Sequence, residues 1–373
     1  MGTKKWKNVL LILLSSLLIL SLGISLFLSP VQVFSEAENR VLAGFPEWRV
    51  NSLLDGSFSQ KFSKFCADQF PLRSFLVALS AYSDLAMGRG EHNGILFGDG
   101  GFLIPRGDEN DLSVLSENLD SIASLSSHSQ TPVSLFFVPR HADVLTDLLP
   151  DGAIGESTRE VAKTLSSFPL PTLFPIERWQ GRAEYYYKTD HHLSAKGAYA
   201  AYLLLSDALG FSPKEETYFE PLTVSDSFLG TSYSTAGGVS FSSDSVTLYR
   251  YEQDDRFLVC YEGSAEPSSG FYHWDALEKK DKYSIFLGGN YARLTVSDPT
   301  ADPKPRLLLI KDSYANALIP FLAIHYDLTV LDPRYRLMGM TENLLDYDRV
   351  LILYGLDTLA KDPSLQRFLS SLS

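Results

Sequence analysis

One short run of the sequence places an acid beside two histidines, Asp190-His191-His192, with Ser194 just after them. Ser194 suits the N-cap of a helix that reaches Leu209, so the acid and the histidines belong to extended or turn backbone before that helix. Residues two apart in extended chain face the same side. The Asp190 carboxylate can therefore accept the Nδ1–H of His192 and stabilise its cation, which leaves Nε2 free as a general base.

A metal site is the competing reading of the same run, because neutral imidazole and carboxylate suit zinc. Adjacent histidine side chains diverge in extended backbone, and no third ligand stands at a supporting spacing. We therefore expect neither a metal nor another cofactor. A purely structural role, with one histidine satisfying buried backbone groups, is the remaining alternative.

The second feature is Lys311-Asp312-Ser313-Tyr314, which follows a strongly apolar run. It reads as the carboxyl end of a strand meeting the start of a helix, the edge where open parallel sheets bind ligands. Ser313 would there expose its hydroxyl and place its backbone N–H near the positive end of the helix, which suits an oxyanion. The alternative is that Asp312 or Ser313 is an ordinary N-cap.

Further candidates for substrate contacts lie in two short segments. Gly289 and Asn290 offer a backbone N–H in a glycine turn and an amide side chain, both of which serve as oxyanion donors. Arg334 and Tyr335 follow a predicted strand end and can line the same sheet edge. Ser232 is a rival nucleophile, but its segment lies in a β-rich stretch with no helix expected after it and lacks the Gly-x-Ser-x-Gly pattern.

Alternating helix and strand patterns place these residues on one architecture. Strands are predicted at residues 133–138, 306–310, 328–331 and 350–354, and helices at 111–128, 142–149, 314–326 and 341–347. Pro320 stands inside one of these helices and should shorten or kink it. Such alternation predicts an α/β fold with a largely parallel sheet that is covered on both faces.

Three other segments complete the organisation. A helical neck is predicted from about Asn51 to Met87, and a hairpin from Asn93 to Ile104. Between about Phe211 and Asp298, Gly, Ser, Tyr and Thr dominate around short alternating runs, which predicts a β-rich insertion. The domain borders follow as a neck over residues 29–90 and a larger domain over 91–373 that carries the insertion.

The N-terminus reads as a membrane anchor. Residues from Val9 to Leu28 carry no charge, and about 20 such residues span a bilayer core as a helix. Lys4, Lys5 and Lys7 precede them, so residues 1–8 are expected in the cytoplasm and the rest of the chain outside it. A cleaved signal peptide is the alternative, but no Ala-x-Ala site follows the apolar segment.

The amino-acid composition limits the kinds of partner that the protein is expected to bind. The net charge of −13, with no basic run past the anchor, argues against nucleic acid and anionic lipid surfaces. A neutral or weakly charged substrate fits better. The chain has two cysteines, Cys66 and Cys260, which can pair outside the cell or remain small buried residues.

Taken together, several motifs resemble the bacterial DHHW protein family, in matching order over nearly the whole part after the anchor. They are Ser35-Glu36-Ala37-Glu38-Asn39-Arg40, Asp68-Gln69-Phe70-Pro71-Leu72-Arg73, Thr189-Asp190-His191-His192, Phe286-Leu287-Gly288-Gly289-Asn290, Lys311-Asp312-Ser313-Tyr314-Ala315-Asn316 and Asp332-Pro333-Arg334-Tyr335. One departure is plain, because the name-giving Trp of the family is Leu193 here.

That family is similar to the SGNH-hydrolase-like proteins that O-acetylate alginate and other envelope polysaccharides. The resemblance implies a flavodoxin-like, three-layer α/β/α domain in permuted order, with Asp190, His192 and Ser313 as a catalytic triad. It also implies Gly289 and Asn290 as oxyanion donors. By analogy, an integral-membrane acyl-donor protein is the expected partner and an envelope polysaccharide the expected substrate.

The sequence is compatible with two functions. In the first, His192 deprotonates Ser313, which takes an acetyl group and passes it to a sugar hydroxyl or to water, as a transferase or an esterase. In the second, the protein binds glycan or scaffolds an acetylation complex without catalysis, through Tyr-rich surfaces such as Tyr185 to Tyr187.

Overall fold

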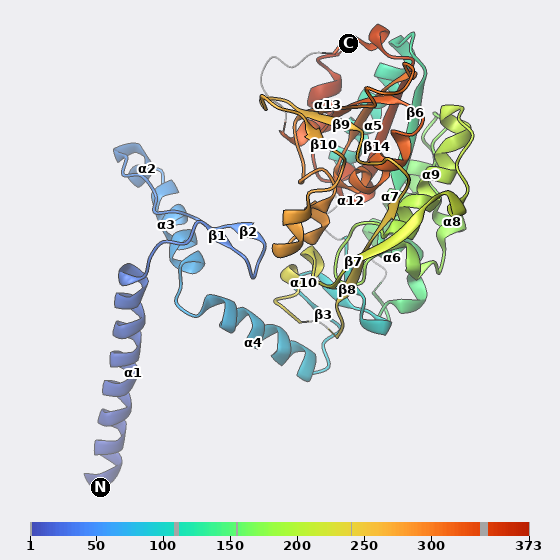
Figure 1. Cartoon of the computed structure of the whole chain (residues 1–373). Coiled ribbons are helices and arrows are strands. Elements are labelled where there is room, and N and C mark those ends of the chain that lie inside the picture. Colours follow the sequence, from blue (N-terminus) through green and yellow to red (C-terminus); the bar gives the residue numbers. More distant parts are fainter. Residues whose placement is uncertain (1, 108–111, 154–155, 240, 336–341, 373) are drawn as a thin grey trace. The chain divides into compact units, whose positions relative to one another are not determined.

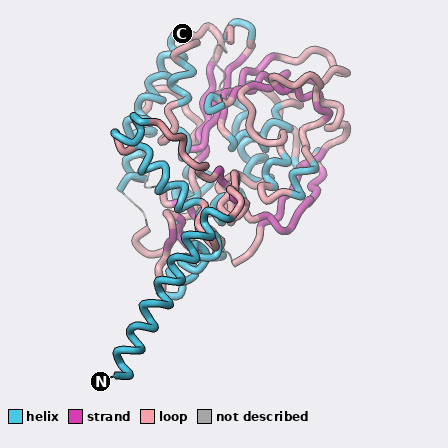
Figure 2. The backbone as a smooth tube through the Cα atoms, turned by 90° about the vertical axis from the view of Figure 1, so that its left-hand side faces the viewer, coloured by secondary structure: helices cyan, strands magenta, loops and turns pink. Residues whose placement is uncertain are grey.

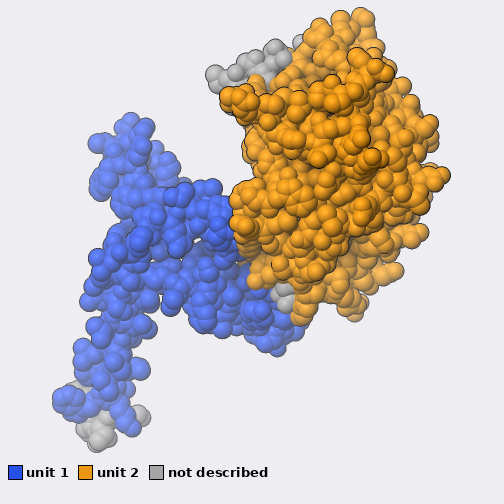
Figure 3. Space-filling model, viewed as in Figure 1, with its two compact units in different colours: residues 1–89, 237–239 blue, residues 90–236, 240–373 orange. Residues whose placement is uncertain are grey.

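The computed structural model describes residues 2–107, 112–153, 156–239, 241–335 and 342–372. The chain forms two compact units (Figure 3). The first comprises residues 1–89 and 237–239, and the second comprises residues 90–236 and 240–373.

The first unit begins with a long apolar helix, α1 (Gly2–Leu28), which Figure 2 shows as one uninterrupted coil from the N-terminus. Among the described residues, it is the one helix long and apolar enough to cross a membrane, over Trp6–Leu28. A helix of this kind near the N-terminus fits either an anchor or a signal sequence.

The predicted neck helix is broken into three, α2 (Val50–Leu54), α3 (Ser57–Asp68) and α4 (Arg73–Ala86) (Figure 1). Gly56 separates the first two with a positive φ of 77°. Pro71 disfavours helical backbone before it, and Leu72 takes a positive φ of 62°. The apolar residues of the neck therefore keep a helical spacing, although the helix itself is interrupted at Gly56 and Leu72.

Ion pairs explain two of the motifs in this unit. Strands β1 (Phe34–Ser35) and β2 (Arg40–Val41) form a small hairpin. Arg40 pairs with Asp68 at 2.6 Å, and Arg73 pairs with Glu38 at 2.7 Å. The charged residues thus tie the hairpin to the ends of α3 and α4, which is a structural role.

The second unit is built on a seven-stranded sheet in the order β10-β9-β11-β13-β12-β14-β6. Its strands are β6 (Val133–Val138), β9 (Leu258–Tyr261), β10 (Ser268–Ser269), β11 (Arg293–Ser297), β12 (Arg306–Lys311), β13 (Asp327–Leu331) and β14 (Arg349–Gly355). The four strands β13, β12, β14 and β6 are parallel. The predicted strands of the α/β core are confirmed to within one or two residues at each end.

Both faces of this sheet are buried. Along β12, Leu307 and Leu309 enter one hydrophobic cluster, whereas Leu308 and Ile310 enter another. The first cluster includes α9 (Ala195–Leu209), and the second includes α5 (Leu112–His128) and α13 (Ser364–Leu369). Helices therefore cover both faces, as parallel strands require.

The remaining helices are short, and three predicted helices differ from the expected form. The short helices are α6 (His141–Val144), α7 (Glu156–Ser166), α8 (Ile176–Trp179), α10 (Thr231–Thr235), α11 (Ile319–Leu322) and α12 (Leu356–Leu359). The one predicted at 142–149 is split into α6 and a 3-10 helix, η2 (Thr146–Leu148). The predicted helix at 314–326 is a 3-10 helix, η7 (Ser313–Leu318), followed by α11, whose first turn holds Pro320. The predicted helix at 341–347 is reduced to η9 (Leu344–Asp346). Asp111 and Thr341, the expected first residues of two helices, lie outside the described residues.

The β-rich stretch from 211 to 298 contributes strands to two different sheets. Strands β7 (Glu220–Phe228) and β8 (Asp244–Arg250) form a separate hairpin. Strands β9, β10 and β11 instead extend the main sheet, and β11 pairs antiparallel with β13. The predicted hairpin near residues 93–104 is present as β4 (Ile95–Phe97) and β5 (Leu103–Pro105), with β3 (Glu91–His92) beside it.

One edge strand of the main sheet is short, and the other is partly covered. β10 holds two residues, and on the other edge β6 pairs with the chain at Leu173, which exchanges backbone hydrogen bonds with Leu135 and Phe137.

Both cysteines, Cys66 and Cys260, are free.

Candidate active site

Asp190 and His192 form a close pair through an Asx turn. Asp190 Oδ1 accepts the backbone N–H of His192 at 3.0 Å and lies 2.5 Å from His192 Nδ1. An ionised carboxylate is only an acceptor, so Nδ1 carries the proton and Nε2 is the free nitrogen of the neutral ring. The sequence predicted this pairing; the turn, rather than extended chain, produces it.

The other oxygen of Asp190 is fixed by a distant segment. Its Oδ2 accepts the backbone N–H of Thr231 at 2.7 Å. Burial alone would raise the pKa of Asp190, but the charges of His192 and His191 and these hydrogen bonds lower it well below the usual value. Asp190 is therefore ionised at all physiological pH values.

Because Gly230 has no side chain, its segment can lie this close to Asp190. A Cβ at Gly230 would lie 2.3 Å from Asp190 Cβ and 2.4 Å from its Oδ2, distances at which something must shift. Thr189, which precedes Asp190, is also fixed by a distant residue. It donates its backbone N–H and its hydroxyl to Asp244 at 2.7 and 2.6 Å. Local sequence gave no sign of Thr231, Gly230 or Asp244 as supports.

Ser313 lies at the carboxyl edge of the parallel strands, as predicted. It is the first residue of η7, and Asp312, not Ser313, is the N-cap, accepting the N–H of Tyr314 at 3.0 Å. Asp312 also accepts the N–H of Gly355 at 2.9 Å, which fixes η7 against the end of β14. As the first residue of the helix, Ser313 has a backbone N–H without an acceptor inside that helix.

Tyr283 connects Ser313 with His192. Its hydroxyl donates to the carbonyl oxygen of Ser313 at 2.9 Å. Its ring stacks on the ring of His192, with centroids 3.9 Å apart and planes 10° apart. One tyrosine side chain therefore contacts both the ring of the predicted base and the backbone of the predicted nucleophile.

His192 Nε2 is buried and has no hydrogen-bond partner in the part of the chain that the structure describes. Ser313 Oγ therefore does not hydrogen-bond to it in this structure. Catalytic hydrogen bonds are often long in unliganded sites and tighten when substrate binds. A buried nitrogen without a partner also costs free energy, which an incoming hydroxyl would recover.

Three consecutive left-handed residues present Asn290. Leu287, Gly288 and Gly289 have φ values of 62°, 73° and 119°. Asn290 Oδ1 then accepts from Lys311 Nζ and from the Asn316 amide, both at 3.1 Å. Both contacts use Oδ1, so the NH₂ group remains the donor of this side chain. Gly289 donates its N–H to Phe286 at 3.3 Å, a long bond within the turn.

Arg334 belongs to the same buried network, whereas Tyr335 lies at its surface. Arg334 donates to both oxygens of Asp332 at 2.9 and 2.7 Å, and Lys311 Nζ lies 3.4 Å from the same carboxylate. Tyr335 is exposed, with the Arg334 guanidinium 5.6 Å from its ring centroid. The Arg334 guanidinium is thus used in an ion pair with Asp332, close to the group that contacts Asn290.

The two histidines lie closer together than expected. Their ring centroids are 4.0 Å apart, because a turn replaces the extended backbone that would have separated them. Ligand atoms of Asp190, His191 and His192 lie within 4.8 Å of one another. Asp190 Oδ1 already lies against His192 Nδ1, so a cation held between these two atoms would have to replace that contact.

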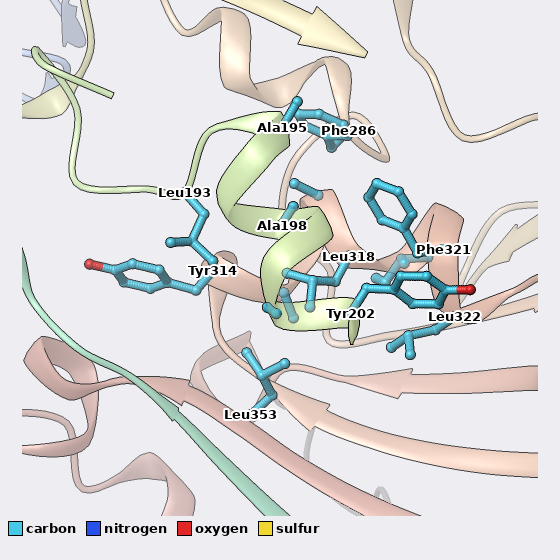
Figure 4. Close-up of a cluster of buried hydrophobic side chains, with 14 of the residues drawn as sticks. Leu193, Ala195, Ala198, Tyr202, Phe286, Tyr314, Leu318, Phe321, Leu322 and Leu353 are labelled. Carbon is cyan, nitrogen blue, oxygen red and sulfur yellow. The ribbon is translucent and has the colours of Figure 1, made fainter. Parts of the chain in front are cut away.

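Two further expectations are corrected. A short helix, α10, does follow Gly230, and Ser232 inside it is buried. Tyr186 and Tyr187 are also buried, 4% and 3% exposed, so they cannot form a glycan-binding surface. Leu193, at the position of the family tryptophan, is fully buried in the same cluster as Tyr314, alongside α9 (Figure 4).

The fold and the site together define an α/β protein with a buried Asp-His pair at the carboxyl edge of its sheet. Residues 173–330, less than half of the chain, match the family model described as DHHW protein. The structure is also similar to that of a DHHW family protein from Eubacterium siraeum, with a TM-score of 0.60 and 18% identity, over 76% of this chain and 97% of that one. The resemblance to the DHHW family is confirmed.

Two other solved structures are similar. Bacillus cereus PatB1 matches with a TM-score of 0.59 and 17% identity, over 74% of this chain and 99% of PatB1. The O-acetyltransferase domain of Pseudomonas putida AlgJ covers 74% of this chain and 98% of its own at 14% identity, with a TM-score of 0.44, too low to support a conclusion. At these identities the likeness establishes the fold alone. Among curated proteins, none matches the chain significantly.

Proposed function

We propose that the protein is a serine acyltransferase or esterase acting on O-acetyl groups of a cell-envelope polysaccharide, with a permuted SGNH-hydrolase-type fold. The observation that carries this proposal is the Tyr283 link, which stacks on His192 and bonds to the carbonyl of Ser313. A nucleophile and a base oriented by a third group are the parts of such a site.

In the proposed reaction, Ser313 Oγ attacks the acetyl carbonyl carbon while His192 Nε2 takes its proton. The bond between that carbon and the leaving oxygen breaks, and the leaving oxygen takes the proton from His192. An acetyl-serine remains. A sugar hydroxyl or water then attacks in the same way, and Ser313 recovers its proton. Asp190 stabilises the imidazolium, and the N–H of Ser313 with the amide of Asn290 binds the oxyanion.

PatB1, which shares the fold, has been solved with a sulfonyl adduct. Sulfonyl reagents attach to activated nucleophiles, so the same chemistry provides a test here. The full chain in detergent micelles would be incubated with phenylmethylsulfonyl fluoride and assayed with p-nitrophenyl acetate. We expect a single adduct on Ser313 by peptide mass spectrometry, and loss of acetate release in both Ser313→Ala and His192→Ala.

The matched control is Ser212→Ala, because Ser212 is an exposed serine outside the motifs of the site. It should keep the activity and the adduct. If Ser313→Ala releases acetate as fast as the unchanged protein, the serine mechanism is wrong.

The membrane anchor is part of the proposal. The helix α1 would hold the protein as a single-pass anchor, with the second unit outside the cytoplasm and beside an integral-membrane acyl-donor protein. External protease added to intact spheroplasts should digest the second unit, and N-terminal peptides upstream of Ser29 should remain in the mature protein. Recovery of a mature chain that starts after Leu28 would indicate a cleaved signal sequence instead.

A second function, glycan binding without catalysis, is favoured by the missing hydrogen bond between His192 and Ser313. In that case acetate release and sulfonyl labelling would both be absent, while glycan binding remained. The labelling experiment therefore separates the two functions.

A further inference from the structure

Helix α4 leaves an apolar side exposed. Large apolar side chains recur along it and at its N-cap, at the spacing of three and four residues that keeps to one side of a helix. They are Leu72, Phe75, Leu76, Leu79 and Tyr82, each between 43% and 70% exposed. The opposite side of α4 is packed within the first unit, because Ala81 is fully buried and a Cβ on Gly237 would lie 2.9 Å from the Ala81 Cβ. The five exposed residues, the α4 stripe, are therefore not the side by which α4 packs in this unit.

The first residue of the α4 stripe takes a backbone conformation that disfavours its side chain. Leu72 has a φ of 62°, in the left-handed region where a bulky residue is strained and glycine is preferred. Its side chain is 70% exposed, so it fills no place in a core in return for this strain. Strained backbone that a fold retains is a mark of functional positions. Leu72 therefore indicates a contact of the stripe with another surface.

The α4 stripe starts near the end of α1. Gln69, just after α3, donates its side-chain amide to the carbonyl of Gln32 at 2.9 Å and accepts the Gln32 N–H at 3.0 Å. Gln32 lies four residues after Leu28, the last residue of α1, so at most about 14 Å of chain separates the two. The turn between α3 and α4 is thereby tied close to the point where the chain leaves α1.

A hollow in the first unit shows the same closeness. It has a volume of about 460 Å³, and its lining includes Ser29 and Pro30, the residues that follow α1. Leu72 and Phe75, the first two residues of the stripe, line the same hollow. If α1 crosses a bilayer, the start of the stripe therefore lies at the membrane surface. No other molecule is then needed to bring a partner within its reach.

The charge of the neck differs from that of the second unit. Residues 29–89 hold six acidic and six basic side chains, whereas residues 1–28 hold three lysines and no acid. The excess of acids behind the net charge of −13 therefore belongs to the second unit. An anionic membrane surface repels that unit but not the neck. Contact through the α4 stripe would thus depend on apolar area and not on charge.

We propose that the α4 stripe lies in the interface of the bilayer that α1 crosses, so that the neck makes a second membrane contact. A helix with one apolar side lies in the plane of a bilayer, with that side about 5–10 Å into the boundary between headgroups and acyl chains. Tyrosine, as at position 82, is enriched at this depth. The inference rests on the proposed anchor, because α1 is what places a bilayer beside the stripe.

This contact would change what the neck does. Gly90, where the second unit begins, follows the end of α4 at Ala86 by four residues. A stripe held in the bilayer would keep that entry point within about 14 Å of chain from α4 and hence near the membrane. The neck would act as a surface-bound spacer rather than as a free linker.

Spin labels on the full chain test the contact. In a background of Cys66→Ser and Cys260→Ser, a nitroxide is attached to a single new cysteine, either Leu79→Cys on the stripe or Ser74→Cys. Ser74 is exposed on the same helix, about 140° away around its axis. In phosphatidylcholine vesicles, relaxation by oxygen, which concentrates among acyl chains, is compared with relaxation by a water-soluble nickel chelate. Oxygen should dominate at Leu79, and the chelate should dominate at Ser74.

Two further measurements test the cause of the contact. Phosphatidylglycerol added to the vesicles should leave both accessibilities unchanged, because the charges of the neck balance. Phe75→Ser with Leu76→Ser, made in the Leu79→Cys chain, should turn the label toward the nickel chelate. Ser74→Ala with Ser80→Ala is the matched control, since both serines are exposed on α4 outside the stripe, and it should leave the label in lipid. Circular dichroism and thermal unfolding show that each chain is folded.

Two results at Leu79 overturn the proposal. Access to the nickel chelate equal to that at Ser74 would mean that the stripe faces water. A label closed to both reagents would mean that a second copy or another protein covers it. A label at Leu18→Cys, in the middle of α1, tests the anchor in the same vesicles.

The label in α1 keeps the two proposals apart. Oxygen access at Leu18 with chelate access at Leu79 would leave the anchor standing and remove the neck contact. Chelate access at Leu18 with oxygen access at Leu79 would remove the anchor and leave the neck contact. Chelate access at both positions would remove both.

Discussion

Tyr283 and His192 stack face to face, with ring centroids 3.9 Å apart and planes within 10° of parallel. The two residues are separated by 91 positions in the chain, and the tyrosine hydroxyl also holds the carbonyl of Ser313. One side chain therefore sets the orientation of the candidate base and the position of the segment that carries the candidate nucleophile.

Replacing Tyr283 should lower turnover in two steps. Tyr283→Phe keeps the stacked ring but removes the bond to Ser313, and we expect kcat for p-nitrophenyl acetate to fall about threefold to tenfold. Tyr283→Leu removes both contacts, and we expect a fall of about 100-fold. Tyr187→Phe is the control, because the buried Tyr187 hydroxyl makes no hydrogen bond to the described residues. Equal rates for Tyr283→Phe and the unchanged protein would mean that the link does not position Ser313.

Gly230→Ala should disrupt the Asp190–His192 pair while both of these residues stay unchanged in sequence. The added methyl would meet Asp190 at 2.3 Å, so the carboxylate must turn away from His192. We expect kcat to fall about 1000-fold, near the effect of losing the orienting acid of a triad. The low-field NMR signal of the His192 Nδ1 proton should disappear as well. Gly44→Ala, where no atom lies within 4 Å of the new Cβ, serves as the control, and a retained Nδ1 signal in Gly230→Ala would refute the steric argument.

Asn290 should contribute to the oxyanion site through its NH₂ group. Asn290→Asp keeps an oxygen for Lys311 and Asn316 but loses the donor, and Asn290→Ala loses both. We expect each to lower kcat about 100-fold, the effect of removing one oxyanion donor, with KM little changed. Steady-state kinetics on folded variants would check this. A fall in Asn290→Ala alone would show that Asn290 acts by supporting Lys311.

His141 should make the protein less stable in mild acid. It is buried and donates from Nε2 to the carbonyl of Tyr187 at 2.9 Å, and burial lowers the pKa of His141 to about 4. Between this value and the unfolded pKa near about 6.5, the unfolded chain binds more protons, so the free energy of unfolding falls as the pH falls. The loss attributable to this residue is about 3 kcal/mol when complete.

Urea unfolding at about pH 7 and about pH 4.5 would measure this dependence. His141→Gln can still donate to Tyr187 but does not titrate, so its free energy of unfolding should change less between the two conditions. Other histidines with a lowered pKa, such as the partly buried His325, titrate in both proteins and cancel in the comparison. Identical pH dependence in the two proteins would show that His141 is not the acid-sensitive group.

The sequence predicted the parts of the site that depend on local geometry. Ser194 caps the helix from Ala195 to Leu209, and its hydroxyl accepts the N–H of Gly197 as an N-cap should. Asp190 and His192 are two residues apart, so one turn suffices to pair them. Ser313 follows an apolar strand, and a parallel strand exposes the residues at its carboxyl end.

The supports of the site could not be predicted because they come from distant segments. Thr231 follows Asp190 by 41 residues, and Tyr283 precedes Ser313 by 30. Neither stands in a pattern that distinguishes it from other threonines and tyrosines of a Tyr-rich chain. The spacing of apolar residues likewise predicted a continuous neck, since it carries no signal for the backbone turn at Leu72.

The two edges of the main sheet affect how copies of the protein behave at high concentration. An unpaired strand edge is a template on which another chain can add a strand, the usual start of aggregation through sheets. Here β10 offers only two residues, and the chain at Leu173 already occupies part of the outer edge of β6. We expect folded molecules crowded together to resist edge-to-edge association, so that solubility depends on the apolar helix α1 rather than on the sheet.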